Sequence, residues 1–190
     1  MDNENTEVNL EYKIDSALLV NLDKYRFRKS FDCGLPVISK YYHDNLKRAL
    51  VSENVSCIGA CSESAELIGF CTLTFSELDK ARVKTFLPEG NIMPVVKVIK
   101  LAMLGVDVEY QGLGIGRALL MTAFQRVFKV HGEIPVKGIF LDAAPNAVGF
   151  YNALGFQELD EPDEHGSTPM FLHIKYVKAA VQAAAMGSSK

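Results

Sequence analysis

The chain has 190 residues, of which 48% are hydrophobic and 23% are charged, and its formal net charge at pH 7 is −3. These values are typical of a soluble globular domain that buries a substantial core. No apolar run reaches the length of a transmembrane helix, and the polar, acidic residues 1–5 do not resemble a signal peptide, so we expect a cytoplasmic protein with no membrane partner.

Charge is distributed unevenly along the chain. Residues 24–100 carry twelve Lys or Arg against eight Asp or Glu, a balance of +4, whereas residues 1–23 carry one against six, a balance of −5. The middle of the chain therefore predicts a basic face on a protein that is acidic as a whole.

The four cysteines lie among apolar or strand-like residues and have no histidines at metal-ligand spacing. We therefore expect reduced thiols and no metal site. The four are Cys33, Cys57, Cys61 and Cys71.

The first elements in chain order are a strand and a helix. Residues 8–14 alternate apolar and polar side chains, as a half-buried strand does, and a short helical turn follows. Asp32 and Gly34 signal a turn or N-cap just before a helix that has Pro36 near its first turn. This helix is expected to end near residue 50.

A β-hairpin is expected next. Residues 55–61 and 67–75 predict two strands, which the polar residues 62–66 join by a turn. Residues 76–94 are mixed and contain two prolines and a glycine, so we expect a loop with one helical turn at most. Such loops commonly carry specificity.

The central motif is a strand, a glycine turn and a helix. Residues 95–106 are rich in β-branched and aliphatic residues and predict a buried strand. Apolar residues at helical spacing predict a helix that extends to about Val130, and Gly112, Gly114 and Gly116 lie between the two elements. Unpaired N–H groups at the start of that helix, together with the helix dipole, favour an anion, most naturally a phosphate. A tight turn without a ligand is the alternative.

The glycine turn differs from two common nucleotide motifs. It lacks the Gly-Lys-Ser/Thr of a P-loop. Its G-x-G-x-G spacing also differs from the G-x-G-x-x-G of dinucleotide-binding folds, and no acidic ribose ligand is apparent in a following strand.

The remaining elements alternate in type. Residues 136–142 predict a strand, residues 147–154 a short helix that Gly155 ends as a C-cap, and residues 156–159 the start of a further strand. Residues 160–168 then form an acidic, turn-rich loop.

The last predicted strand covers residues 170–176, whose apolar side chains alternate. Residues 179–190 are small and polar. We therefore expect one domain over residues 1–178, followed by a flexible C-terminal tail over residues 179–190.

Two motifs together resemble the GNAT superfamily of acetyl-CoA-dependent N-acetyltransferases. Residues 111–116, Gln-Gly-Leu-Gly-Ile-Gly, fit the Gln/Arg-x-x-Gly-x-Gly/Ala loop that binds pyrophosphate in that family. Some 40 residues later, Ala147, Phe150-Tyr151 and Gly155-Phe156 fit its second signature. The resemblance implies an α+β fold, GNAT-like, in a single domain. Its mixed, mostly antiparallel central sheet is flanked by helices and splayed at the acetyl-CoA cleft.

The resemblance also implies the roles of individual residues. The backbone N–H of Leu104 or Val106 is the expected oxyanion donor, and Tyr151 is the expected acid for the leaving thiolate, with a core tyrosine as the alternative. No base is compelling: Asp107 and Glu109 lie near the loop, and a water relay or an already neutral amine removes the need for one. The residues expected to bind acetyl-CoA are Leu104, Val106, Gln111, Gly112, Leu113, Gly114, Ile115, Gly116, Arg117 and Phe150.

Two positions depart from the family pattern. Many members place an asparagine seven residues before the tyrosine, where this chain has Ala144, so a side-chain contact to the pantetheine arm is in doubt. Some members carry a glutamate base on the central strand, where this chain has Lys100.

The acceptor amine is suggested by a second resemblance. Residues 28–34, Arg-Lys-Ser-Phe-Asp-Cys-Gly, and Leu104-Gly105-Val106-Asp107 resemble a toxin-like GNAT branch. That branch acetylates the α-amine of aminoacyl-tRNA and pairs with antitoxins. Phosphate neutralisation would then need a basic face, for which a solvated charged surface is the alternative. The candidate residues are Arg26, Arg28, Lys29, Lys80, Arg82, Lys84, Lys97 and Lys100.

Other assignments stay open at this point. The acceptor could instead be a small-molecule or protein amine, or the chain could be an inactive acyl-CoA-binding module. An antitoxin partner and a homodimer are both compatible with the resemblance.

Overall fold

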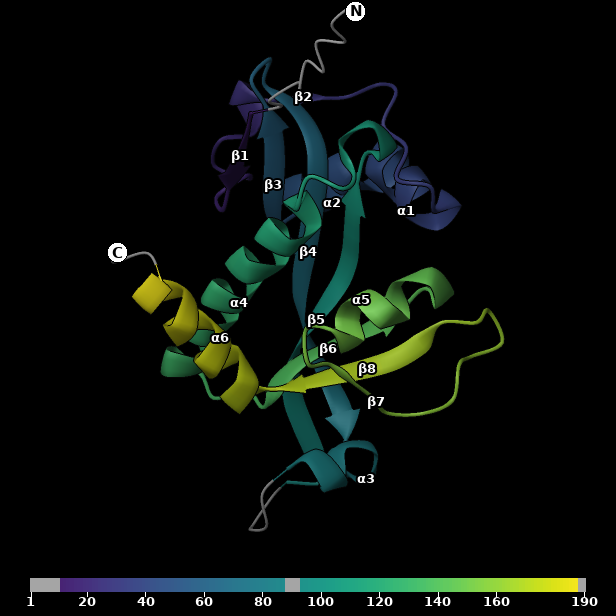
Figure 1. The fold of residues 1–190 in the computed structure, drawn as a ribbon, viewed down its shortest axis with the longest axis vertical. Helices are drawn as coiled ribbons and strands as arrows, with labels where there is room; N and C mark the ends of the chain where they lie inside the picture. The colour runs from purple at the N-terminus through teal and green to yellow at the C-terminus, as the bar shows by residue number, and fades with distance from the viewer. Residues whose placement is uncertain (1–10, 88–92, 188–190) are drawn as a thin grey trace, which may run out of the picture.

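A single mixed sheet runs through the part of the chain that the computed structural model describes, residues 11–87 and 93–187 (Figure 1). Its strand order is β1-β3-β4-β5-β6-β8-β7, and β2 pairs with β4 outside this path. The β5–β6 and β2–β4 pairs are parallel, and the others are antiparallel. The strands are β1 (Tyr12–Asp15), β2 (Arg26–Phe27), β3 (Ser56–Ser62), β4 (Glu66–Asp79), β5 (Val95–Val106), β6 (Gly138–Ala143), β7 (Gln157–Glu158) and β8 (Thr168–His173).

Helices cover both faces of this sheet, so the α+β prediction is confirmed (Figure 1). A π-helical turn (Tyr42–Leu46) joins α1 and α2 into one continuous helical segment. Short 3₁₀ turns occur at Leu22–Lys24, Lys84–Phe86, Val108–Tyr110 and Pro145–Ala147. The helices are α1 (Pro36–Tyr41), α2 (Lys47–Val51), α3 (Lys80–Val83), α4 (Ile115–Glu133), α5 (Val148–Asn152) and α6 (Ile174–Gly187).

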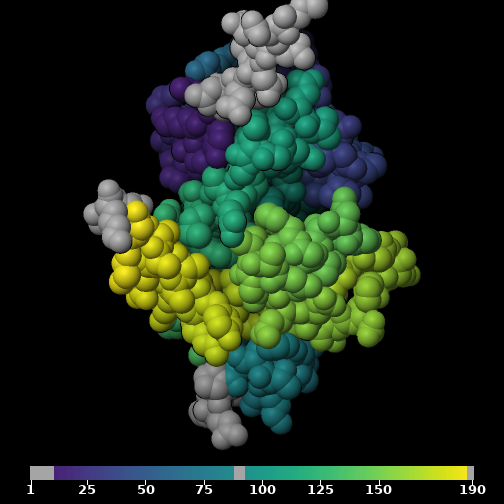
Figure 2. Space-filling model, viewed as in Figure 1, coloured from purple at the N-terminus to yellow at the C-terminus, as the bar shows by residue number. Residues whose placement is uncertain are grey.

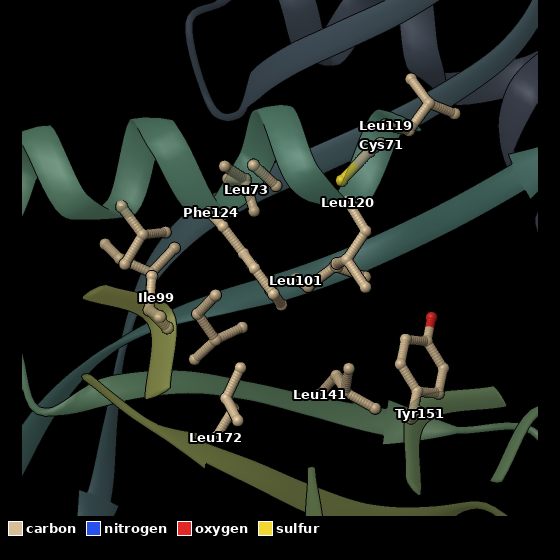
Figure 3. Close-up of a cluster of buried hydrophobic side chains, with 14 of the residues drawn as sticks. Cys71, Leu73, Ile99, Leu101, Leu119, Leu120, Phe124, Leu141, Tyr151 and Leu172 are labelled. Carbon is tan, nitrogen blue, oxygen red and sulfur yellow. The ribbon is translucent and has the colours of Figure 1, made fainter. Parts of the chain in front are cut away.

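The sheet separates two main apolar clusters. On one face, Leu119, Leu120 and Phe124 of α4 pack onto strand residues such as Leu73 and Leu101 (Figure 3). On the other face, Phe31 stacks on the buried Tyr42 with ring centroids 3.8 Å apart. Burial on both faces explains why β5 reads as a nearly continuous apolar run.

The sheet splits between β5 and β6. These strands pair only where Ile99 and Lys100 face Ile139 and Phe140. Beyond this point β5 continues to Val106 while β6 turns away toward α5 (Figure 1). The splayed central pair predicted from the motifs is therefore present.

Most predicted elements are confirmed within a few residues. The central strand has the predicted bounds, and Gly155 adopts a left-handed φ of +89° after α5, as a C-cap does. The first strand is seen only over Tyr12–Asp15, since residues 8–10 of the prediction lie outside the described residues.

The loop expected over residues 76–94 is wrong in its first part, because β4 continues to Asp79. The short α3 that follows corresponds to the helical turn that the prediction allowed. Residues 88–92 lie outside the described residues. The strand extension was not predicted because Ser76 and Glu77 have polar side chains, which are more typical of a loop. They belong to a two-stranded ribbon in which Glu77 faces Lys97 and forms an ion pair with it.

The expected end of the last strand is also wrong. β8 ends at His173, and residues 174–187 form α6, so residues 179–187 are helical. Alternation up to Tyr176 was misleading, because Ile174 and Val177 are buried at helical spacing. The alanines that follow have the highest helix propensity, and α6 packs beside α4. None of the helices in the described ranges is long and apolar enough to cross a bilayer.

Candidate active site

The glycine turn places a row of free amides at the start of α4. Gly112 and Gly114 have φ values of +80° and +79°, which only glycine adopts readily, and Gly114 is the N-cap of the helix. The N–H groups of residues 114–117 precede the first intrahelical partners, so they are free to bind an anion. The predicted strand, turn and helix therefore produce the geometry of a phosphate site.

The space in front of this turn is open. A Cβ added at Gly112 or Gly114 would meet nothing within 4 Å, and one at Gly116 would meet only Val106 Cγ2, at 3.9 Å. Gly116 has an ordinary helical backbone, so neither packing nor strain within the described chain explains why it lacks a side chain. Close approach of a ligand does explain it, and the turn therefore fits a pyrophosphate group.

The side chain of Gln111 ties the glycine turn to the end of β5 and to the segment before α1. Its side-chain amide donates to the carbonyl oxygens of Val106, at 2.9 Å, and Cys33, at 3.1 Å. The side-chain N–H groups of Gln111 are thus used within the protein. For the predicted contact with acetyl-CoA, Gln111 can therefore offer its backbone and its side-chain carbonyl oxygen.

A β-bulge precedes the end of β5, at the gap where β5 and β6 separate. The register of the β4–β5 pair shifts between Thr72 and Leu73. After it, the N–H of Asp107 donates to Ile68 O on β4, at 2.9 Å. Because successive amides point to opposite sides of a strand, the N–H groups of Leu104 and Val106 point away from β4, toward the gap between β5 and β6.

These elements surround a cleft of about 430 Å³. The volume lies within the usual range of ligand pockets, about 300–1,000 Å³. On the face shown in Figure 2, the segment around α5 lies directly below α1 and the glycine turn. The predicted residues that line the cleft are Leu104, Val106, Gln111, Gly112, Gly114, Ile115, Gly116, Arg117 and Phe150.

Two predicted residues are not among those lining the cleft. Leu113 is at the tip of the turn and 43% exposed, so only its backbone is suited to a ligand. Tyr151 is 6% exposed and packs with Phe150 and Phe156 inside the apolar cluster beneath α4 (Figure 3).

The Tyr151 hydroxyl is nevertheless unusual. It has no hydrogen-bond partner among the described residues, and Figure 3 shows it pointing away from Leu141, toward the side on which β5 and α4 lie. Burial raises the pKa of this phenol well above its ordinary value, so Tyr151 stays protonated at neutral pH. A protonated phenol without a partner suits a proton donor, although its burial equally suits a core residue.

The structure adds cleft residues that the motif analysis missed. Asn146 is the most polar of them; it lies two residues after Ala144, where the family asparagine was sought. Asn146 lies in the 3₁₀ turn that Pro145 begins, at a position that the family spacing did not indicate. The other additions are Cys33, Leu35, Gly105, Tyr110 and Ala147.

Residues 28–34, which we call the 28–34 loop, are fastened to the end of β5. Val108 N donates to Asp32 O at 2.8 Å, and Gln111 bonds to Cys33. Arg28 lies 3.1 Å from the buried Asp107 and 2.5 Å from Glu109. The loop therefore forms one wall of the cleft.

Asp32 closes a turn just before α1, whose N-cap is Leu35 and has no side-chain cap hydrogen bond. Asp32 Oδ1 accepts hydrogen bonds from Gly34 N and Ser39 Oγ, both at 2.9 Å. These hydrogen bonds hold the carboxyl's pKa below its ordinary value. The expected turn is therefore present, without an N-cap at Asp32, and it precedes Cys33 and Leu35 at the cleft.

No general base emerges from the geometry. The described residues that line the cleft include no aspartate, glutamate or histidine. The two carboxylates considered from the sequence, Asp107 and Glu109, both face Arg28. This arrangement is consistent with loss of the amine proton to water.

The residues predicted to form one basic face lie at different places in the structure, and half of them are paired with carboxylates. Arg28, Arg82, Lys97 and Lys100 each form an ion pair with a carboxylate, so half of the candidate cations are already neutralised. Lys80 and Lys84 belong to α3 and the turn after it, at the opposite end of the molecule from β2 (Figure 1). Arg26 and Lys29 lie beside the cleft wall, in or next to β2.

Comparison with known proteins identifies the fold. A family model described as an acetyltransferase (GNAT) domain matches residues 39–171. A crystal structure of a bacterial toxin superposes with a TM-score of 0.84 and 35% identity, covering 91% of this chain and 96% of the toxin. No curated protein matched the sequence significantly.

Two structures of AtaT share the fold at 21% identity. AtaT complexed with acetyl-methionyl-tRNAfMet has a TM-score of 0.73 and covers 89% of this chain and 98% of AtaT. An AtaT tyrosine-to-phenylalanine variant, bound to the C-terminus of the antitoxin AtaR and acetyl-CoA, has a TM-score of 0.69 and covers 90% of this chain and 97% of that one.

Proposed function

The chain belongs to the GNAT acetyltransferase family and is an acetyl-CoA-dependent N-acetyltransferase, and we propose that its acceptor is the α-amine of aminoacyl-tRNA. The observation that carries this proposal is the 35% identity to a bacterial toxin over 91% of the chain. The fold shared with AtaT, a protein captured with acetyl-methionyl-tRNAfMet, supports the same acceptor.

The 28–34 loop supports the proposal from within the chain. Its resemblance to the toxin-like branch rests on residues that the structure fastens to the cleft, since Asp32 and Cys33 accept hydrogen bonds from Val108 and Gln111. A local turn before α1 would not by itself require these long-range hydrogen bonds. We therefore assign the loop to the acceptor side of the cleft.

The chain's own residues would act as follows. The amides of residues 114–117 hold the pyrophosphate, and Asn146 and Phe150 lie along the path toward the end of β5. The N–H of Leu104 or Val106 donates to the oxygen of the thioester carbonyl as negative charge develops on it. Removal of one such donor typically lowers the rate by about 10²–10³-fold.

The bond changes balance without a further reactant. The neutral amine nitrogen bonds to the acetyl carbon while the carbon–sulfur bond breaks. Tyr151 gives its proton to the departing thiolate, and the proton of the new ammonium passes to water, from which the tyrosinate is restored. An acceptor amine that is neutral near pH 7 suits a cleft without a carboxylate.

A partner is also part of the proposal. AtaR is the antitoxin bound to AtaT, so we expect an antitoxin for this chain. An acceptor of another type, a small-molecule or protein amine, is the second candidate, because the family fold and the acetyl-CoA cleft do not depend on RNA.

Transfer of labelled acetyl groups separates these candidates. A pool of charged tRNAs is incubated with the protein and labelled acetyl-CoA, with uncharged tRNA and polyamines in parallel. Label on charged tRNA alone is the expected result. Label on the polyamines and none on charged tRNA would remove the tRNA proposal and leave the acetyltransferase activity intact.

A further inference from the structure

A second hollow is lined by the first residues of the 28–34 loop, whose Cys33 lines the acetyl-CoA cleft. It has a volume of about 770 Å³ and is lined by β2, the first half of the 28–34 loop and the helical segment that follows. We call it the basic groove, after the exposed side chains of Arg26, Lys29 and Lys47 in its lining.

The cations of the basic groove are unpaired. None of the three has a carboxylate within ion-pair distance in the described ranges, and Arg26 donates only to the carbonyl of Ser64, at 3.0 Å. The groove's one acidic lining residue, Glu66, faces Arg28 at 3.4 Å. Arg28 is shared with Asp107 and Glu109, so it offsets Glu66 only in part. The cations of the lining still outnumber its one carboxylate, and such a concave surface attracts polyanions.

This distinguishes the basic groove from the other cationic surfaces predicted from the sequence. Arg82, Lys97 and Lys100 are each matched by a carboxylate. Lys47 was not among the predicted residues, although it lies only 18 positions from Lys29 in the sequence. Only the fold of the helical segment beside β2 brings the two together.

Aromatic rings form part of the groove wall. Tyr25 and Phe27 are half-buried there, and Phe27 packs against the buried Tyr42 with ring centroids 5.5 Å apart. Aromatic side chains interleaved with basic ones are typical of surfaces that bind single-stranded nucleic acid, since bases stack on the rings while phosphates meet the cations.

The basic groove and the acetyl-CoA cleft both use the 28–34 loop as part of their walls. Ser30 lines the groove, and Cys33 lines the cleft. Three residues of extended chain span at most about 11 Å, so these two lining residues lie within that distance of each other. A strand that ends at the acetyl group in the cleft is therefore within reach of the groove.

We propose that the basic groove holds the sugar–phosphate backbone of the single-stranded acceptor end of tRNA, with Arg26, Lys29 and Lys47 bound to its phosphates. This inference rests on the proposed function, because it supplies the RNA site that acetylation of aminoacyl-tRNA requires. It replaces the broader basic face predicted from the sequence.

Charge reversal in the full-length protein tests the groove. The groove variant is Arg26→Glu/Lys29→Glu/Lys47→Glu. The matched control is Lys84→Glu/Lys129→Glu/Lys137→Glu, which makes the same change in net charge at exposed lysines that have no carboxylate partner among the described residues. Initial rates are measured with a charged tRNA pool between 50 and 200 mM salt, and acetyl-CoA affinity is measured by calorimetry.

We expect the groove variant to raise KM for charged tRNA by about tenfold or more at 100 mM salt. The slope of log KM against log salt should fall by about 2–3, roughly one for each phosphate that the variant no longer neutralises. Acetyl-CoA affinity should stay as in the wild type, and the control should keep both KM and slope close to wild-type values.

The outcomes separate the two proposals. A wild-type protein that transfers no acetyl to charged tRNA removes the proposed function. An active wild type, with groove and control variants that behave alike, removes the basic groove and leaves the proposed function. If the three reversals prevent folding, the neutral set Arg26→Gln/Lys29→Gln/Lys47→Gln carries the same test, with a smaller expected change.

Discussion

The guanidinium of Arg28 lies 3.1 Å from the carboxylate of Asp107, and this pair joins two segments that are far apart in the sequence. Asp107 is 1% exposed and the Arg28 side chain 14%. The Arg28 Nε–H does not form a regular hydrogen bond with Asp107, so the contact is ionic. The pair fixes the 28–34 loop against the end of β5, where the acetyl-CoA cleft begins.

Replacement of Arg28 tests how much this pair contributes. Removal of one partner leaves the buried carboxylate unpaired, which typically costs about 3–5 kcal/mol. We expect Arg28→Met to lower the free energy of unfolding by about 3 kcal/mol, or Tm by about 6–12 °C for a chain of this size. Denaturant unfolding and calorimetry measure both.

The surface pair of Arg82 and Asp160 is the control for this change. Both of its side chains are over one third exposed, so Arg82→Met should cost less than about 1 kcal/mol. The double variant Arg28→Met/Asp107→Asn should recover part of the lost stability. Equal, small losses for both arginines would show that the Arg28 pair is not structural.

The glycine turn gives a test of acetyl-CoA binding. In Gly116→Val the new side chain projects into open space near Val106, so the fold should survive. The same side chain stands where a pyrophosphate must approach the helix amides. We expect a loss of acetyl-CoA affinity of at least about tenfold by calorimetry, equivalent to about 1.4 kcal/mol.

Gly132→Ala is the matched control, because it lies in the same helix and its Cβ also meets nothing within 4 Å. It should leave affinity unchanged. Gly114→Val is a harsher variant, since its φ of +79° makes any side chain strained. Unchanged affinity in folded Gly116→Val protein would place the pyrophosphate elsewhere.

Tyr151→Phe isolates the proposed proton donor. The hydroxyl has no hydrogen-bond partner among the described residues, so its removal breaks no hydrogen bond within them and should leave stability and acetyl-CoA affinity unchanged. We expect kcat to fall by about 10²-fold, the low end for a lost general acid. Wild-type kcat in the variant would leave Tyr151 as a packing residue of the core.

Much of this site follows from local sequence. Glycines that require positive φ, a buried apolar strand and a helix with an apolar face are each encoded within a few residues, so the strand, turn and helix were predictable. The second motif around Tyr151 was located by its resemblance to the family's second signature.

Long-range relationships were not predictable in this way. Arg28 pairs with Asp107 across 79 positions, and no local signal distinguishes it from Lys29, which has no carboxylate partner within the described ranges. The helical C-terminus was missed because alternation up to Tyr176 resembles a strand. The alanines after it were a local helix signal, and packing of α6 beside α4 supports the same outcome.

Cysteine labelling tests the position of the 28–34 loop without an activity assay. Cys33 is buried, at 8% exposure, but lines the cleft, whereas Cys61 and Cys71 are 1% and 0% exposed in the core, where burial raises their pKa values to about 12. Since the thiolate is the reactive form, iodoacetamide at pH 8 should modify Cys33 first. Saturating acetyl-CoA should slow this reaction at least about tenfold.

Mass spectrometry identifies the modified residue, and Cys33→Ser is the control that should abolish the fast phase. Fast labelling of Cys61 or Cys71 would contradict the packing of the sheet. Labelling of Cys33 that acetyl-CoA does not affect would contradict its place in the acetyl-CoA cleft.

The pH dependence of the rate should follow the acceptor and not the enzyme. No carboxylate or imidazole lines the cleft within the described residues, so the enzyme supplies no base that titrates between pH 5 and 8. The neutral amine is the nucleophile, and kcat/KM should therefore rise with pH through the pKa of the acceptor's own amine and then level off.

No descending limb is expected up to pH 9. Burial raises the pKa of Tyr151 above its usual value near 10, so the phenol stays protonated over this range. Rates with two acceptors of different amine pKa check the argument. The midpoint of the rise should move with the acceptor, and Glu109→Gln should leave it in place, because Glu109 faces Arg28 and not the cleft. A midpoint that is the same for both acceptors would instead reveal a base on the enzyme.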